Sequence, residues 1–360
     1  MDVTAPAHRL SAAVSAASRL LPARAALRLR AGTAGLTVAG NDPDLAVLFD
    51  CPATTHTHGE VAVPAAPLAE TLKMLGAEPV RVVVEGSRLA LRLDQARFAL
   101  PLLSAPAGSP AVEPPRVSEV DGPAFASALR IVAGTAAKDD PLPLFTGVRV
   151  QAGDGRLTLT ASDRYRMAVA RLPLRSPGSL DVLVPAALLT EAARQARGVV
   201  GLHSGPGRFG LSWAGGLVGT AVLDAGFLSE EAIPSGAVDT TVTLDADALA
   251  AAVRRVGVYA EDRRVLTVEV GDNQVRLASA RQDTGEAEET LKADVGGGRT
   301  SPSFQARYLL DALGAFAGER VVLSIQPGMR ACVLRAADVD VDVAVGEVEL
   351  TYYLMPMLAR

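Results

Sequence analysis

Cysteine and lysine are scarce in this chain of 360 residues. Only two cysteines, Cys51 and Cys332, are present, and they lie far apart in the sequence. A disulfide scaffold uses more cysteines at closer spacing, so the pattern predicts two buried free thiols in a reducing compartment. Lysine accounts for only three of the 35 basic residues. The excess of arginine and the abundance of alanine are explained first by a coding bias of the genome, and only second by a physical role in the protein.

Long apolar runs and a targeting segment are also lacking. No apolar run reaches the ~18 residues that a membrane helix needs, and the first ten residues contain no basic segment followed by an apolar one. We therefore expect a cytoplasmic protein without membrane association. The net charge of −5 argues against a surface coated in positive charge. A local basic surface could still bind nucleic acid.

Sequence motifs of common enzyme classes are missing. There is no GxxxxGK[ST] phosphate loop and no GxGxxG after a strand. In GLHSG (201–205) the serine is one place late for a nucleophile elbow. His56 and His58 supply only two metal ligands, which is typical of a polar loop rather than of a metal site. We therefore expect a protein that is not an enzyme, with no catalytic residue, metal or cofactor.

A strand followed by a proline and a helix occurs three times in the chain. The pattern is present at 59–75 and 179–196 and, more weakly, at 300–316. Aligning Val63, Val184 and Phe304 gives spacings of 121 and 120 residues. A single hydrophobic core stops growing at about 250–300 residues, so a chain of this length should form several domains. The spacing predicts three repeats that fill the chain.

Each repeat is expected to combine helices with short antiparallel strands. The first helix of each repeat is predicted at 8–21, 123–136 and 245–258, where small and apolar residues gather. Joins rich in Pro, Gly and Ser at 104–115 and 229–236 separate the repeats. The strands predicted for the first and last repeats are 80–84, 89–93, 98–102, 321–325, 332–335, 339–345 and 350–355.

The fold class predicted is therefore α+β, with three repeated domains of two helices packed on antiparallel sheet. The predicted domains are 1–115, 116–235 and 236–360. Exposed sheet edges in such domains invite pairing with another chain. Similar domains in an arc can close into a ring by head-to-tail contacts.

Three stretches carry a specific resemblance: LTLTASDRYRMAVARLP (157–173), FQARYLLDAL (304–313) and YLMPM (353–357). They resemble the bacterial sliding clamps, the beta subunit of DNA polymerase III, and the resemblance covers all three repeats. It implies a homodimeric ring that encircles duplex DNA without sequence preference. It also implies a processivity factor that tethers the replicative polymerase and performs no chemistry.

The resemblance further implies a pocket between the second and third domains for short peptides of the polymerase, the clamp loader and repair proteins. Methionine adapts to different partner side chains, and Arg and Tyr supply donors and flat surface at a rim. From the residues alone, the favoured interpretation is that the Met-Pro-Met segment plugs a core. The positions carried over are Leu144, Phe145, Ser162, Arg164, Tyr165, Arg166, Met167, Ala232, Pro234, Gln305, Tyr308, Tyr353, Leu354, Met355, Pro356 and Met357.

Several of these positions depart from the family pattern. Leu142 stands where an Arg is usual, Gln305 replaces an Asn, and Tyr353 replaces a smaller Val or Leu. In the second join, which is one residue short, the departures are Leu228, Glu231 and Ala232. Because the changes cluster on one site, we hypothesise a divergent second clamp copy that tolerates a pocket-directed antibiotic. A clamp-like protein that no longer loads on DNA is a further alternative.

Basic residues on or near the helices should line the bore of such a ring. Phosphate contacts by Arg and Lys carry no sequence information and weaken with salt, as a sliding protein requires. Each of these residues could also be an ordinary surface charge. The residues predicted to face DNA are Arg24, Lys73, Lys138, Arg194 and Arg197, within a wider set that includes Arg9, Arg19, Arg254, Arg255 and Arg307.

The dimer contact is predicted at the last strand of the first repeat, QARFALPLL (95–103). In the family this strand pairs with an edge of the third domain in the other subunit. Phe98 and Leu100 would then face Val258 and Tyr259 of the partner. The alternative is that all four are core residues of their own domains.

Overall fold

The computed structural model describes residues 1–104, 114–227, 230, 233, 236–260, 265–281, 285–337 and 348–358, without the side chain of residue 281. The predicted strand 339–345 and the linker positions Leu228, Glu231, Ala232 and Pro234 lie outside these residues. The chain forms two compact units, and the middle repeat contributes to both. Unit 1 consists of Met1–Ser127, Ala152–Gly155 and Leu174–Leu223; unit 2 consists of Ala128–Gln151, Arg156–Pro173 and Asp224–Arg360.

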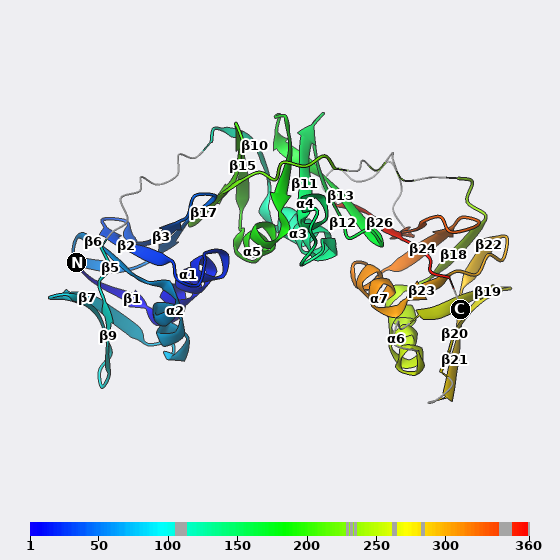
Figure 1. The fold of residues 1–360 in the computed structure, drawn as a ribbon, viewed down its shortest axis with the longest axis horizontal. Helices are drawn as coiled ribbons and strands as arrows, with labels where there is room; N and C mark the ends of the chain where they lie inside the picture. Colours follow the sequence, from blue (N-terminus) through cyan, green and yellow to red (C-terminus); the bar gives the residue numbers. More distant parts are fainter. Residues whose placement is uncertain are drawn as a thin grey trace. The chain divides into compact units, whose positions relative to one another are not determined.

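Unit 1 begins with a five-stranded antiparallel sheet. The order of its strands is β5 (Thr54–Thr57), β1 (Asp2–Pro6), β7 (Pro79–Glu85), β8 (Arg88–Arg92) and β9 (Arg97–Pro101). The three strands predicted at 80–84, 89–93 and 98–102 are thus confirmed to within one residue. Helices α1 (Ala7–Leu20) and α2 (Ala65–Met74) pack against each other (Figure 1). Leu10 and Leu68 are buried there because apolar residues recur on one face of each helix.

A second antiparallel sheet joins the first and middle repeats inside unit 1. Its strands, in order, are β6 (Gly59–Pro64), β2 (Ala26–Gly32), β3 (Gly35–Asn41), β4 (Leu45–Cys51), β17 (Gly216–Ala221), β16 (Arg208–Trp213), β15 (Val199–Gly205) and β10 (Arg116–Asp121). Strands β4 and β17 pair over Leu45–Phe49 and Gly216–Thr220. The edge of one repeat is therefore closed by the edge of the next.

An ion pair adds to this connection. The Arg19 guanidinium of α1 donates to both carboxylate oxygens of Glu191 on α5 (Ala186–Gln195), at 2.7 and 2.6 Å. Arg194 and Gln195 also donate to Glu191, which is only 3% exposed. Burial alone would raise the pKa of Glu191, but the hydrogen bonds and the charge of Arg19 outweigh it and hold the pKa below its usual value.

Unit 2 contains seven consecutive strands of a larger antiparallel sheet, among them the last strand of the chain. Their order is β12 (Arg156–Ser162), β13 (Arg166–Ser176), β26 (Glu349–Leu354), β25 (Cys332–Ala336), β24 (Arg320–Ile325), β18 (Thr240–Asp245) and β22 (Asp294–Gly297). The strands predicted at 321–325, 332–335 and 350–355 are confirmed. Strands β11 (Gly147–Gly153) and β14 (Leu180–Pro185) belong to the middle repeat.

A smaller sheet and two helices complete the last repeat. The sheet order is β21 (Gly285–Lys292), β20 (Gln274–Arg281), β19 (Val265–Gly271) and β23 (Ser303–Gln305). Helix α6 (Ala246–Val256) continues into a 3-10 turn at Gly257–Tyr259 and packs on α7 (Ala306–Gly314). The Asp245 carboxylate caps α6 by accepting from the Ala248 N–H at 2.7 Å.

The helices agree with the repeat pattern. Those predicted at 8–21, 123–136 and 245–258 begin within one residue of α1, α3 (Gly122–Thr135) and α6. The middle repeat adds a short helix, α4 (Pro143–Thr146). Pro64 and Pro185 lie one residue before α2 and α5, where extended backbone leads into the helix. None of the described helices is long and apolar enough to cross a membrane.

Both cysteines are buried free thiols, as the sequence predicts. Burial raises the pKa of Cys51 to about 11 and that of Cys332 to about 12. Neither thiol is therefore ionised near neutral pH, and both act as small core residues.

Candidate functional site

The last strand of the chain lies between two other strands of unit 2. On one side β26 pairs with β13, with Met167 opposite Tyr353. On the other side it pairs with β25. Beyond the strand, the Met355 N–H donates to the Tyr165 carbonyl at 2.9 Å and the Met357 N–H donates to the Ser303 carbonyl at 2.7 Å. The apolar end of the chain is thus held by backbone hydrogen bonds, while the Met355 side chain stays 36% exposed.

The turn between β12 and β13 is built by the SDRYR sequence. The Ser162 hydroxyl donates to the Arg166 carbonyl at 2.8 Å, and Asp163 Oδ1 accepts from the N–H groups of Tyr165 and Arg166 at 3.1 and 3.2 Å. Asp and Ser favour such turns because their short side chains bond to nearby backbone. Arg164 has a φ of 78°, which only a few non-glycine residues adopt. The turn leaves Tyr165 exposed and places Arg166 inside.

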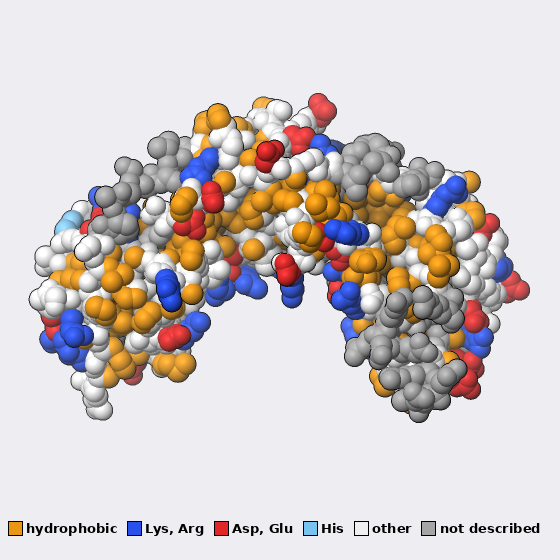
Figure 2. All heavy atoms as spheres, viewed as in Figure 1, with side chains coloured by type: hydrophobic (Ala, Val, Ile, Leu, Met, Phe, Trp, Pro, Cys, Tyr) orange, Lys and Arg blue, Asp and Glu red, His pale blue; other side chains and the backbone are white. Residues whose placement is uncertain are grey.

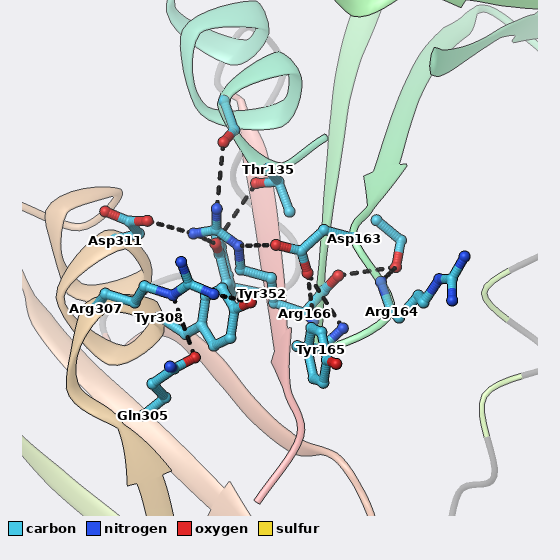
Figure 3. Close-up of polar contacts among 12 residues, drawn as sticks. Thr135, Asp163, Arg164, Tyr165, Arg166, Gln305, Arg307, Tyr308, Asp311 and Tyr352 are labelled. Atoms are coloured by element: carbon cyan, nitrogen blue, oxygen red, sulfur yellow. Dashed lines mark hydrogen bonds and ion pairs between the residues drawn. The ribbon is translucent and has the colours of Figure 1, made fainter. Parts of the chain in front are cut away.

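Arg166 connects four elements of unit 2 (Figure 3). Its Nε lies 3.0 Å from Asp163 Oδ2, and its Nη1 lies 2.5 Å from Asp311 Oδ2 on α7. The same nitrogen donates to the Tyr352 hydroxyl on β26 at 3.2 Å, and Nη2 donates to the Gly134 carbonyl on α3 at 3.4 Å. The side chain is only 9% exposed, so both carboxylates and the other acceptors are needed to compensate its burial.

Tyr308 carries an aromatic and cationic cluster beside the end of the chain. Its ring stacks on Tyr165, with centroids 5.6 Å apart and planes inclined by 18°. The guanidinium carbons of Arg307 and Arg166 lie 4.4 and 4.9 Å from the Tyr308 centroid. Arg307 also donates to the Tyr308 hydroxyl at 2.7 Å and to Gln305 Oε1 at 3.2 Å (Figure 3). Cations over the ring face and a stacked tyrosine fix the orientation of Tyr308.

A second aromatic contact is made by the middle repeat. The Arg164 guanidinium lies 4.5 Å from the Phe145 ring centroid and donates to Asp140 Oδ1 at 2.9 Å. Phe145 is nearly buried, whereas Leu142 is exposed. The position at which the family usually has an Arg thus carries an apolar side chain facing solvent.

Tyr353 has a partner of its own. Its hydroxyl donates to a carboxylate oxygen of Glu230, and Arg171 donates to the other oxygen of that carboxylate. Burial, together with the hydrogen bond to the Glu230 carboxylate, raises the pKa of Tyr353 to about 12. Tyr353 is thus half-buried, with its hydroxyl hydrogen-bonded.

The structure distributes the predicted pocket residues between surface and core. Arg164, Tyr165 and Met355 are exposed. The buried positions are Phe145, Ser162, Arg166, Met167, Tyr308, Leu354 and Pro356. The remaining described positions, Leu144, Gln305, Tyr353 and Met357, are half-buried.

Sequence reasoning missed the acidic partners of these arginines. Asp140, Asp163 and Asp311 were not predicted as site residues, although Asp163 lies inside the SDRYR motif. Asp311 likewise lies inside the FQARYLLDAL motif, four residues after Arg307 on one helix.

The residues predicted to face DNA are all exposed. Arg24, Lys73, Arg194 and Arg197 belong to unit 1, and Lys138 belongs to unit 2. Lys and Arg side chains are visible at the surface of both units in Figure 2. That these residues face DNA stays a prediction. Arg307, from the wider set, lies in the Tyr308 cluster instead of on a separate basic face.

The predicted dimer residues do not all lie at the surface. Phe98, Val258 and Tyr259 are exposed, with Val258 at 75%. Leu100 is 8% exposed and belongs to the core of the first repeat. Among the described strands, β9 pairs only with β8 and β21 pairs only with β20, so each is a sheet edge.

Comparison with known proteins places this architecture in one class. The chain matches, in order, the N-terminal domain of the DNA polymerase III beta subunit over residues 7–107, its central domain over 119–228 and its C-terminal domain over 230–356. A Pseudomonas aeruginosa sliding clamp bound to griselimycin has the same fold, with a TM-score of 0.88, 22% identity and full coverage of both chains.

Two curated relatives are similar along the sequence. The beta sliding clamp of Streptomyces coelicolor is 28% identical over 370 residues, covering 97% of this chain and 96% of that one. The "Beta sliding clamp homolog GriR" of Streptomyces muensis is 27% identical over 295 residues and 77% of each chain. The fold is therefore that of the sliding clamps, non-catalytic processivity factors of DNA replication. The chain belongs to the DNA polymerase III beta subunit family.

Replacing Arg166 with Met should destabilise unit 2 by about 3 kcal/mol, because it leaves Asp163 without its partner in a nearly buried position. Arg166→Lys should keep only part of the stability that Arg166→Met loses, since an ammonium cannot make the several planar hydrogen bonds of a guanidinium. Urea unfolding followed by circular dichroism measures the difference. The matched control is Arg164→Met, which removes an exposed ion pair worth at most about 1 kcal/mol. Equal losses in the two Met variants would contradict the role of Arg166.

Proposed function

We propose that this clamp binds short partner segments on a surface formed by Phe145, Arg164, Tyr165, Arg307, Tyr308 and Met355, here called the Tyr308 surface. The observation that carries the proposal is the hydrogen bond from the Met355 N–H to the Tyr165 carbonyl. It joins two exposed side chains of apolar character on backbone that is already fixed. By family resemblance, the partners are the replicative polymerase, the clamp loader and repair proteins.

The chemistry of the Tyr308 surface suits this role. Tyrosine and arginine supply much of the energy at protein interfaces, and methionine adapts to several partner side chains. The cluster around Tyr308 is ordered by stacking and by ion pairs within the chain. Little side-chain entropy is then lost on binding, which leaves more of the interaction energy for affinity.

A fluorescent peptide of the Gln-x-x-Leu-Phe type should bind this protein in the micromolar range. Met355→Ala should weaken binding by about tenfold, since truncating an anchor at an interface costs about 1–2 kcal/mol. Fluorescence anisotropy measures both. Met329→Ala removes another exposed methionine of the same unit and should leave affinity unchanged. Failure of the unchanged protein to bind the peptide would contradict the proposal.

We further propose that two copies form a head-to-tail ring around duplex DNA. Strands β9 and β21 are sheet edges with exposed backbone groups. Phe98 on one copy would meet Val258 and Tyr259 on the other. Arg24, Lys73, Lys138, Arg194 and Arg197 would then contact phosphates without reading sequence.

Phe98→Asp should separate the dimer, because it places a charge in an apolar contact. Sedimentation should give a dimer for the unchanged protein and a monomer for the variant. Only the dimer should stay on nicked circular DNA, and it should leave when the circle is cut. The affinity of the protein for DNA should fall steeply as the salt concentration rises.

Val238→Asp alters another exposed apolar side chain and should leave the dimer intact. A dimeric Phe98→Asp variant would contradict the predicted contact. A dimer that binds peptide but is never retained on circles would favour the alternative of a clamp-like protein that does not load.

A second candidate function is a specialised clamp copy that tolerates a pocket-directed antibiotic. The observation that favours it is the hydrogen bond between Tyr353 and Glu230, which is itself held by Arg171. Tyr353 lies near the end of β26, two residues before Met355 in the chain. A tyrosine held by this hydrogen bond would fill space at position 353 that a smaller side chain would leave free for a ligand.

This candidate function predicts weak binding of griselimycin, which the Pseudomonas aeruginosa clamp binds in its solved structure. Tyr353→Val should strengthen binding by about tenfold, because it removes both the ring and its hydrogen bond. Tyr353→Phe keeps the ring and separates volume from hydrogen bonding. Calorimetry on these proteins and on the Pseudomonas clamp gives the comparison. Equal affinity of that clamp and the unchanged protein would rule out tolerance at this site.

A further inference from the structure

Three arginines belong to the Tyr308 surface or contact the Tyr308 ring from inside, and two of them have carboxylate partners. Arg164 pairs with Asp140 at 2.9 Å, and Arg166 pairs with Asp163 and Asp311. Arg307 differs, because its hydrogen bonds go to the Tyr308 hydroxyl and the Gln305 amide oxygen. Within the described part of the chain no carboxylate pairs with it. It is therefore an exposed cation held by neutral acceptors at the rim of the surface.

The position of Arg307 does not serve the stability of its own helix. It lies in the first turn of α7, where the helix dipole disfavours a positive charge. Asp311, four residues later, lies on the same side of the helix, but its carboxylate bonds to Arg166. Two hydrogen bonds and the Tyr308 ring nevertheless fix the Arg307 guanidinium. The charge is thus ordered, accessible and uncompensated.

A partner seated against exposed Tyr165 and Arg307 would remove water from this guanidinium. Covering a charge without pairing it is unfavourable, whereas a carboxylate in the partner would make a charge-assisted hydrogen bond. The apolar side chains of Tyr165 and Met355 at the same surface call for an apolar anchor in the same partner segment. Complementarity therefore requires an acidic and an apolar group close together.

We propose that Arg307 is a specificity-determining residue that selects partner segments carrying an Asp or Glu next to their apolar anchor. The proposal rests on the proposed binding of peptides at the Tyr308 surface. It adds the chemical class of the segment and the residue that distinguishes it. Neutral segments with the same anchor are disfavoured because they leave the guanidinium covered and unpaired, which is how a buried charge confers selectivity.

Two peptides with the same Leu-Phe anchor test this, one with Glu and the other with Gln on both sides of the anchor. The unchanged protein should bind the Glu peptide about fivefold more tightly, the upper range for a partly exposed ion pair. This preference should shrink as salt is added. A preference for the Glu peptide would be opposite to the effect of the protein's net charge of −5, which repels an acidic peptide. Arg307→Gln should bind the two peptides equally.

Arg330→Gln is the matched control, because it makes the same change of charge at another exposed position of unit 2 and should keep the preference. Arg307→Glu should reverse the preference toward a peptide with Lys at these places. Equal binding of the Glu and Gln peptides by the unchanged protein, or a preference retained in Arg307→Gln, would overturn the assignment and leave peptide binding intact. If the unchanged protein bound neither peptide, both the proposed function and the assignment of Arg307 would be overturned.

Discussion

The pairing of the last strand with two neighbours is the constraint on which the candidate site depends. Strand β26 comes from the end of the chain, yet it hydrogen-bonds to β13 of the middle repeat and to β25 of the last. Each backbone hydrogen bond contributes only about 1 kcal/mol, but together they fix the register. A slip by one residue would exchange the faces of Tyr352 and Tyr353. One of these reaches Arg166 and the other reaches Glu230, so neither contact would survive.

Register and charge act together in unit 2. Because Tyr352 is held opposite Ala168, its hydroxyl meets the Arg166 guanidinium, which also holds Asp163 and Asp311. The buried charges are thereby satisfied within the chain. Tyr165 and Met355 stay exposed there, together with Arg164, which pairs with Asp140, and Arg307, which no described carboxylate pairs with. A surface built this way is ordered before a partner arrives, and its selectivity depends on few groups.

Local pattern predicted the elements well and the site only in part. The first helix of each repeat began within one residue of its predicted start, because small and apolar residues recur at helical spacing. The contacts between aspartates and arginines were not predictable, since Asp140 and Arg164, or Arg166 and Asp311, are joined by folding and not by spacing. Leu100 was expected at a dimer contact, but it faces the core of its own repeat. The alternation of side chains along an edge strand does not show which face of the strand packs on the core of its own domain.

The sequence by itself determined the three repeats, the α+β class and the free buried thiols. Each of these depends on residues that are close in the chain or repeated at fixed spacing. The tertiary structure decided that Tyr353 is paired with Glu230 and that Arg307 belongs to the Tyr308 cluster. It also decided that the last residues of the chain are divided between core and surface, with Leu354 buried and Met355 exposed. These outcomes depend on strand register and on charges brought together from distant segments, which no local pattern encodes.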